Sequence, residues 1–505
     1  MRTKKALKNA IVSIIYQVVA VICGLITPRL ILSTFGSTYN GVISSANQFL
    51  EMISFLTLGI AGSTRVALYK PIANNDILSI SRIVKSNKRY MRKVGAAIIL
   101  YAILLCIVYP FVSHNDLSNA ENAALIAIVS IGVFAQYFFG ASNQTLLSAD
   151  QSSYIYYGLQ AGSIVGNTII TAILIKMGCS IFVVKAGSAL IFLFTPIILN
   201  KIVYNKYHLI SDCEPDDTAI KQRGAVAFHS IANIVHEDTD LIVLTLFTDA
   251  KLISVYTVHQ LVAGKVRKML LMLTNGLEGA FGNMWVKKEL VAFERNFRFF
   301  EILIFSFTSI VFCCVGVLIV PFIRLYTMGV TDISYIRPGF AVLTVITEAM
   351  YCIRHPYLIV VQATGNYEPT KMGALYEAII NISLSLVLVN FIGLNGVMFG
   401  TFVANTFRTV QYAFFISNNV IKGSIVGTIR RFIWFLGNSA LVIIIQLLAF
   451  KLLPNTNGWD MWIAHGFVAA LISGALTAIS SYLFFRSEFY QIIGLFKKTL
   501  KKKGQ

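Results

Sequence analysis

Long apolar stretches recur from one end of the chain to the other, and they constrain its fold more than any other feature. About 14 of them are long enough to cross a bilayer as a helix, which takes roughly 18 residues or more. Lipid offers no hydrogen bonds to the backbone, so spanning segments are helices or closed barrels, and the alternating pattern of barrel strands is absent. The sequence therefore predicts an all-α integral membrane protein. The expected spans are residues 10–32, 41–66, 94–113, 123–147, 155–177, 181–200, 224–247, 252–285, 299–326, 338–362, 373–392, 395–417, 432–453 and 462–485.

Charged residues are scarce and unevenly placed. They make up 13% of the 505 residues, against about 25% in soluble proteins. The formal net charge of +19 could indicate nucleic acid, but Lys and Arg stand in short runs between apolar stretches, which is typical of membrane topology and lipid contacts. We therefore expect membrane lipids, and no nucleic acid, as partners. Lys and Arg are concentrated in the loops that share a side with the N-terminus, so both termini are predicted to be cytoplasmic.

The two halves of the chain resemble each other weakly. Residues 39–62 align with 256–279, and residues 149–171 align with 363–385, at nearly equal offsets. Each repeat would hold six spans in the same orientation, which predicts two pseudo-symmetric lobes around a cavity. The expected divisions are an N-lobe at 1–200, a cytoplasmic linker at 201–223, a C-lobe at 224–417, two appended spans at 432–485 and a basic cytoplasmic tail at 486–505.

Basic residues lie inside several predicted spans, where a charge at the helix centre costs about 2.5–3.5 kcal/mol on insertion scales. Such residues usually face a wet cavity or a partner of opposite charge. Arg65 and Lys185 lie near span ends, where a long side chain can reach the interface instead. We expect an anionic substrate to be bound by Arg65, Lys265, Arg267, Lys268, Arg354 and Arg408.

Acidic residues are also present in the spans. Glu237 and Asp240 share one helix face by their spacing, and Glu278 and Glu348 follow in later spans. One interpretation is that these acids only neutralise the buried cations; another is that the span is misplaced and the 237–240 cluster lies at an interface. A third interpretation, which stays open beside the other two, is that Glu237, Asp240, Glu278 and Glu348 couple transport to Na⁺ or H⁺.

No catalytic or metal site is predicted. A phosphate-binding loop ending in Gly-Lys-Ser/Thr and an H-E-x-x-H motif are both absent from the sequence. The seven cysteines are scattered without metal-ligand spacing and are interpreted as small buried hydrophobic residues. We therefore expect a protein that is not an enzyme and that holds no cofactor besides a coupling ion.

Several motifs resemble those of a known family. They are Leu147–Gln151 with Tyr154 and Ile155, Asp238–Ile242 leading to Val255 and Tyr256, Ala363–Tyr367 with Glu377–Asn381, and Gly396–Gly400 with Thr401. Their order and spacing resemble bacterial polysaccharide-repeat-unit flippases of the O-antigen, capsule or teichoic type. These belong to the multidrug/oligosaccharidyl-lipid/polysaccharide exporter superfamily. The 236–240 cluster is more charged than the family pattern, which typically keeps only the acid at Asp240.

The resemblance implies two six-helix lobes that rock between inward-open and outward-open states. It implies a polyprenyl-diphosphate-linked oligosaccharide as substrate, moved from the inner to the outer leaflet of the bacterial plasma membrane, with the last two spans accommodating the lipid tail. Arg and Lys suit a diphosphate, because Arg offers a bidentate fork and Lys a point charge. We expect a functional monomer, with polymerase or chain-length proteins as further partners.

Three alternatives stay open. A lipid II flippase would share the spans and the cationic cavity. A multidrug/toxin antiporter of the same superfamily usually has twelve spans and fewer cavity cations. A membrane-embedded polysaccharide polymerase or glycosyltransferase would change the chemistry of its substrate, and polymerases usually carry a large outer loop that this sequence lacks.

Overall fold

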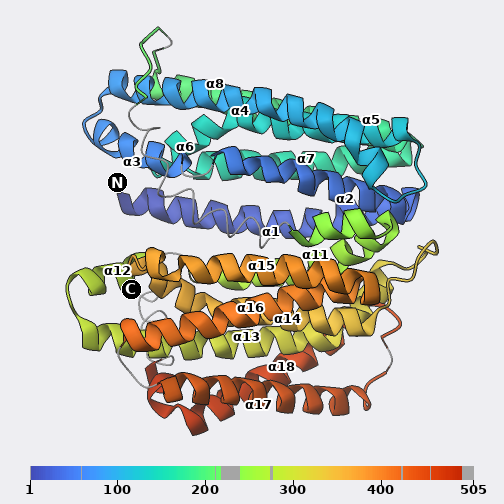
Figure 1. Cartoon of the computed structure of the whole chain (residues 1–505), viewed down its shortest axis with the longest axis vertical. Coiled ribbons are helices and arrows are strands. Elements are labelled where there is room, and N and C mark those ends of the chain that lie inside the picture. The colour runs from blue at the N-terminus through green and yellow to red at the C-terminus, as the bar shows by residue number, and fades with distance from the viewer. Residues whose placement is uncertain are drawn as a thin grey trace. The chain divides into compact units, whose positions relative to one another are not determined.

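In the computed structural model of the chain, the regular secondary structure of the described residues is helical (Figure 1). The structure describes residues 2–57, 60–210, 212–217, 239–272, 274, 277–421, 425–454 and 456–491. Among the first seven residues, the side chain is described for Lys5 alone. Within these ranges the β-type pairing is one isolated bridge between His114 and Asp249. Nine described helices are long and apolar enough to cross a membrane, or ten if one bent pair counts as a single span. The predicted fold class, an all-α multi-pass membrane protein, is confirmed.

The chain folds into two compact units. The N-terminal unit comprises residues 1–257 with 329–333, and the C-terminal unit comprises residues 258–328 with 334–505. The expected lobe, linker and tail boundaries stay predictions. Residues 218–238, which hold the start of the seventh predicted span and the end of the expected linker, lie outside the described residues, as do 492–505 of the tail.

The helices of the N-terminal unit follow the expected order of spans. They are α1 (Arg2–Phe35), α2 (Ser37–Glu51), η1 (Met52–Thr57), α3 (Ile60–Ala73), α4 (Ile77–Val112), α5 (Asn119–Ala135), η2 (Gln136–Gly140), α6 (Ala141–Ala149), α7 (Tyr154–Lys176) and α8 (Ile181–Tyr207). The second predicted span is bent, because α2–η1 and α3 meet at 47°. Residues 239–247 are helical, and α11 (Ala250–Met272) starts in this unit and ends in the other.

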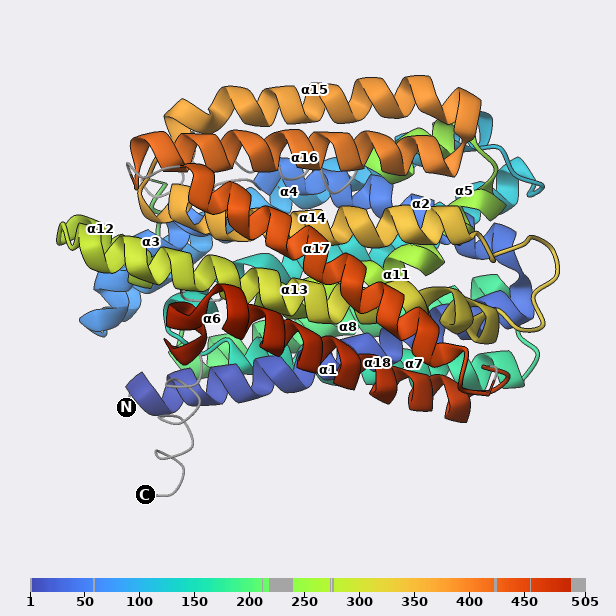
Figure 2. The same cartoon turned by 90° about the horizontal axis from the view of Figure 1, so that it is seen from below.

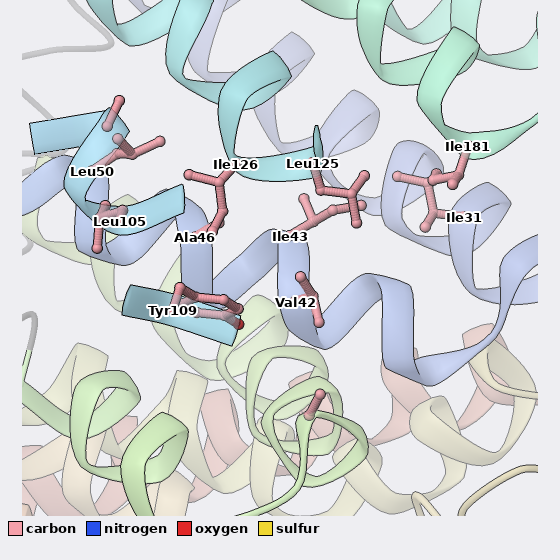
Figure 3. Close-up of a cluster of buried hydrophobic side chains, with 12 residues drawn as sticks. Ile31, Val42, Ile43, Ala46, Leu50, Leu105, Tyr109, Leu125, Ile126 and Ile181 are labelled. Atoms are coloured by element: carbon pink, nitrogen blue, oxygen red, sulfur yellow. The ribbon is translucent and has the colours of Figure 1, made fainter. Parts of the chain in front are cut away.

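An apolar cluster holds the N-terminal unit together (Figure 3). Ile43 and Ala46 of α2 lie on the side of Leu125 and Ile126 of α5 in this cluster, and all four are buried. In a bilayer, such packing stabilises the bundle through van der Waals contacts between closely fitted side chains. The cluster thereby fixes α2 against α5.

The C-terminal unit contains α12 (Leu277–Val286), α13 (Leu290–Tyr326), α14 (Pro338–Ala363), α15 (Tyr367–Ile392), α16 (Leu394–Asn419), α17 (Ile425–Phe450) and α18 (Trp459–Phe484). Figure 2 shows α14, α15 and α16 running side by side, and all three belong to one packed group. Gly393, with φ of 56°, turns the chain sharply from α15 into α16. Gly396 and Gly400 then form a small-xxx-small stripe against α15, so the two backbones approach closely.

The last two helices, α17 and α18, are attached to α13 by polar side chains. Asn438 donates to Ser309 at 2.8 Å and to Thr477 at 3.0 Å, and Gln446 donates to Ser473 at 2.6 Å. Hydrogen bonds between membrane helices contribute about 0.6 kcal/mol each on average. The polar contacts therefore give α13, α17 and α18 a defined register.

Candidate functional site

A group of buried charges lies between α14, α15 and α16 in the C-terminal unit. Arg354 of α14 donates to Glu377 of α15, and Arg408 of α16 lies 3.5 Å from the other carboxylate oxygen of Glu377. All three side chains are less than a tenth exposed. One carboxylate therefore bridges two guanidinium groups inside the helical bundle.

Arg408 has further partners that fix its orientation. Its guanidinium donates to the Thr370 carbonyl at 2.9 Å, to Gln411 at 2.6 Å and to the Tyr412 hydroxyl at 2.7 Å. It also lies 4.0 Å from the centre of the Tyr412 ring, which is favourable for a cation over an aromatic face. Gly373 makes room for this arrangement, since a Cβ there would overlap Arg408 Nη1.

A second ion pair extends the group to α11. Arg267 Nε lies 3.2 Å from Glu348 of α14, and both side chains are buried. The guanidinium groups of Arg267 and Arg354 each lie 4.4 Å from the centre of the Tyr351 ring. Tyr351 therefore connects the two ion pairs. We call Arg267, Glu348, Tyr351, Arg354, Glu377 and Arg408 the buried charge group.

The buried charge group has three Arg and two Glu side chains, so its formal charge is +1. Breaking a buried pair by removing one partner costs about 3–5 kcal/mol, because the other charge stays buried without compensation. In this structure each guanidinium of the group already has a carboxylate partner. Another anion could therefore bind these guanidiniums only by displacing Glu377 or Glu348. The arrangement can exchange one carboxylate for another anion.

The other predicted substrate residues are not part of this group. Arg65 of α3 is exposed and belongs to the N-terminal unit. Lys265 is half-buried and Lys268 is exposed, both on one face of α11. The structure thus separates the six predicted cations into three that are buried in ion pairs and three with more accessible side chains.

The predicted coupling residues have different surroundings. Asp240 is buried in the N-terminal unit and accepts a hydrogen bond from the Tyr256 hydroxyl at 3.0 Å. Glu348 pairs with Arg267, and Glu278 of α12 is exposed. Glu237 lies outside the described residues. Among the residues the structure describes, no three His, Cys, Asp or Glu side chains gather in a way that could hold a metal ion.

Sequence reasoning missed two buried acids, Glu377 and Glu301. Glu301 of α13 is fully buried, lies 2.6 Å from Arg431 Nε of α17 and accepts a hydrogen bond from the Tyr357 hydroxyl at 2.5 Å. Both acids fall inside predicted spans, at 299–326 and 373–392, where an ionisable residue is costly and so indicates a partner. Their place inside a span is the signal that could have found them.

No protein-family model matches the chain, and no curated protein sequence matches it. Solved structures do match. The lipid II flippase MurJ, in an inward closed conformation, is 15% identical with a TM-score of 0.69, over 95% of this chain and 98% of that one. A transporter of the MOP superfamily from Pyrococcus furiosus is 13% identical with a TM-score of 0.59, over 83% and 97%. The multidrug transporter DinF-BH is 12% identical with a TM-score of 0.58, over 82% and 95%.

The chain has the fold of the MurJ and MATE transporters. At 12–15% identity the likeness concerns the fold and leaves the substrate undetermined. The MurJ match covers more of this chain than the multidrug transporters do, and α17 with α18, residues 425–484, is long enough to account for the difference.

Proposed function

We propose that this chain is a flippase that moves a polyprenyl-diphosphate-linked oligosaccharide from the inner to the outer leaflet of the bacterial plasma membrane by alternating access. The observation that carries the proposal is the likeness to a lipid II flippase over 95% of this chain. The buried charge group and the accessible cations support an anionic headgroup. The protein acts as a monomer with both termini in the cytoplasm.

The two sets of cations take different roles in this proposal. Arg65, Lys265 and Lys268 contact the diphosphate first, since their side chains are the more accessible ones. Arg354 and Arg408 become available when Glu377 gives way to the diphosphate in another state of the transport cycle. A substrate shifts a conformational equilibrium only if it binds one state more tightly, and exchange of the carboxylate for a diphosphate supplies such a difference.

Coupling to an ion is the second part of the proposal. Asp240 and Glu348 are buried acids with an oxygen or nitrogen partner, so each could hold a proton or contribute to a Na⁺ site once that partner moves. Binding of the ion would return the protein to its inward-open state. If the transport rate in vesicles were the same with and without imposed pH and Na⁺ gradients, the ion-coupling part of the proposal alone would be contradicted.

Transport of lipid II itself is a second candidate, supported by the same likeness to MurJ. Both candidates are tested in proteoliposomes that contain the purified full-length chain and a labelled lipid on one leaflet. The expected result is movement of a polyprenyl-diphosphate-linked oligosaccharide to the other leaflet without chemical change. Joint replacement of Arg65, Lys265 and Lys268 by Ala should lower the rate at least tenfold, whereas Lys176→Ala at the exposed end of α7 should not.

Each alternative has its own outcome in that assay. Faster movement of lipid II than of other oligosaccharide lipids would assign the second candidate. Movement of a cationic drug alone would point to a multidrug transporter, and a lengthened oligosaccharide would point to a polymerase or glycosyltransferase. No movement of any diphosphate-linked lipid would overturn the proposal.

A further inference from the structure

A cavity of about 330 Å³ lies inside the N-terminal unit and takes no part in the buried charge group. It is lined by α2, α5, η2, α6, α7 and α8. Five side-chain amides face it, from Asn47, Gln136, Gln144, Gln160 and Asn167. An amide both donates and accepts hydrogen bonds, so a ring of amides matches a ligand rich in hydroxyl groups.

The backbone around this cavity departs from regular α-helix at two places. Residues 136–140 form a π-helical turn, a feature that recurs at functional sites, and both Gln136 and Gly140 of this turn line the cavity. Pro196 of α8 has no N–H, so the carbonyl of Phe192 one turn earlier cannot receive its usual helical hydrogen bond. A residue of the cavity wall, Phe192, thereby has a backbone carbonyl without its usual helical partner.

Lys185 of α8 supplies a positive charge to the cavity wall. Its position near the end of a predicted span suggests that the side chain reaches the membrane interface, but it lines the cavity instead. Within the described part of the chain, its ammonium makes no hydrogen bond and no ion pair within 4.0 Å. Asn167 Oδ1, also on the wall, is buried without a hydrogen-bond partner among the described residues. The Lys185 ammonium and Asn167 Oδ1 could therefore each form a hydrogen bond with a ligand in the cavity.

The size of the cavity and its other lining residues further restrict the class of ligand that it can bind. A cavity of about 330 Å³ is within the size range of small-molecule sites and is large enough for one sugar residue. Tyr156 and Phe192 give aromatic surface for the apolar face of a sugar ring, and Tyr156 already accepts a hydrogen bond from Gln160 at 3.1 Å. Glu51 lines the cavity as well and can accept hydrogen bonds from sugar hydroxyls.

We infer that this cavity binds a single sugar residue that bears a carboxylate, with Lys185 pairing with the carboxylate and the amides with the hydroxyl groups. The inference rests on the proposed function, since it makes that sugar residue a part of the transported oligosaccharide. It adds that the substrate contains an acidic sugar and that the N-terminal unit recognises it.

Binding of glucuronate and glucose to the purified full-length chain in nanodiscs tests the inference by calorimetry. The two sugars differ in the carboxylate that Lys185 would bind. The wild-type chain should bind glucuronate about tenfold more tightly than glucose, as expected for one hydrogen-bonded charge. Lys185→Gln should abolish that preference, Lys185→Arg should retain most of it, and Lys176→Gln on the exposed end of α7 should leave it unchanged.

A second variant locates the site. Ala189 is a small buried residue on the cavity wall, and Ala189→Phe should fill the cavity and weaken binding of both sugars at least tenfold. Equal affinity of the wild-type chain for both sugars, or a preference that survives Lys185→Gln, would overturn the inference. So would normal binding in Ala189→Phe. None of these readouts involves translocation, so a chain that binds glucuronate through Lys185 and moves no lipid would overturn the proposed function instead.

Discussion

Arg354 and Glu377 form an ion pair between α14 and α15, with both side chains less than a tenth exposed. The same carboxylate lies 3.5 Å from Arg408, so a single acid offsets two buried cations. Buried pairs of this kind contribute little net stability but become strongly destabilising when one partner is lost. An anion would therefore have to displace Glu377 to reach either guanidinium.

Glu377→Gln should lower the free energy of unfolding by about 3–5 kcal/mol, because two guanidinium groups then remain buried without their carboxylate. Chemical denaturation in detergent, compared with the wild-type chain, measures the change. Glu278→Gln, at an exposed position on α12, is the matched control and should change the free energy by less than about 0.5 kcal/mol. A Glu377→Gln protein as stable as the control would show that the guanidiniums are solvated or hold another anion.

The pair formed by Glu301 and Arg431 should show strong coupling in a double-mutant cycle. Glu301→Leu and Arg431→Met should each cost about 3–5 kcal/mol, while the double variant should recover much of the loss because no buried charge is left unpaired. The exposed pair of Glu294 and Arg298 on α13 is the comparison, with an expected coupling below about 0.5 kcal/mol. Additive losses at Glu301 and Arg431 would contradict the prediction.

The spans are predictable because apolar length is a local property of the sequence. The pattern predicts a span at 155–177, and α7 runs from Tyr154 to Lys176. Where a helix continues beyond its apolar part, hydropathy does not reveal it. The span predicted at 94–113 belongs to α4, which begins at Ile77, where the Asp76 side chain caps it by accepting from the Ser79 N–H at 3.0 Å. Basic residues fill the additional turns.

In the candidate site, the buried cations are predictable from the sequence but their acidic partners are not. The cost of a charge in lipid marks Arg267, Arg354 and Arg408 as residues that need partners. Which acid pairs with which cation depends on how α14, α15 and α16 pack, and Glu377 is brought to Arg354 by that packing alone. Lys185 shows the same limit. Its position near a span end predicts that the side chain reaches the membrane interface, whereas in the structure the surrounding helices form a cavity that Lys185 lines.

Close packing of α15 on α16 should make Gly396 intolerant of a side chain. A Cβ there would overlap the backbone of Leu388, so Gly396→Ala must separate the helices and should cost about 1–3 kcal/mol. Gly437 of α17 is the matched control, because a Cβ there meets nothing within 4 Å, and Gly437→Ala should stabilise the helix by up to about 1 kcal/mol. Thermal unfolding of the two variants measures the contrast. Equal stability of both would mean that α15 and α16 pack less closely than in this structure.

Asp150, between α6 and α7, should make stability depend on pH in the acid range. Burial raises the pKa of this carboxyl, but hydrogen bonds from the Tyr207 hydroxyl at 2.6 Å, from Ser152 at 2.7 Å and from the Lys5 ammonium at 2.9 Å outweigh it and lower the pKa. A lowered pKa in the folded state means that the ionised group stabilises the fold. That contribution is complete above the unfolded pKa of about 4 and is lost as the pH falls through the folded pKa.

Asp150→Asn should therefore cost about 1 kcal/mol at pH 7, a small value because the pairing is only partly buried. The difference from the wild-type chain should shrink steadily between about pH 5 and pH 3, as the wild-type carboxyl takes up its proton. Denaturation across that pH range measures it, and Asp116→Asn, which breaks an exposed pair with Lys251 at 3.0 Å, is the control with an expected change below about 0.5 kcal/mol. A difference that grows on acidification would mean that the folded state raises the pKa of Asp150, and the assignment of its hydrogen bonds would then be wrong.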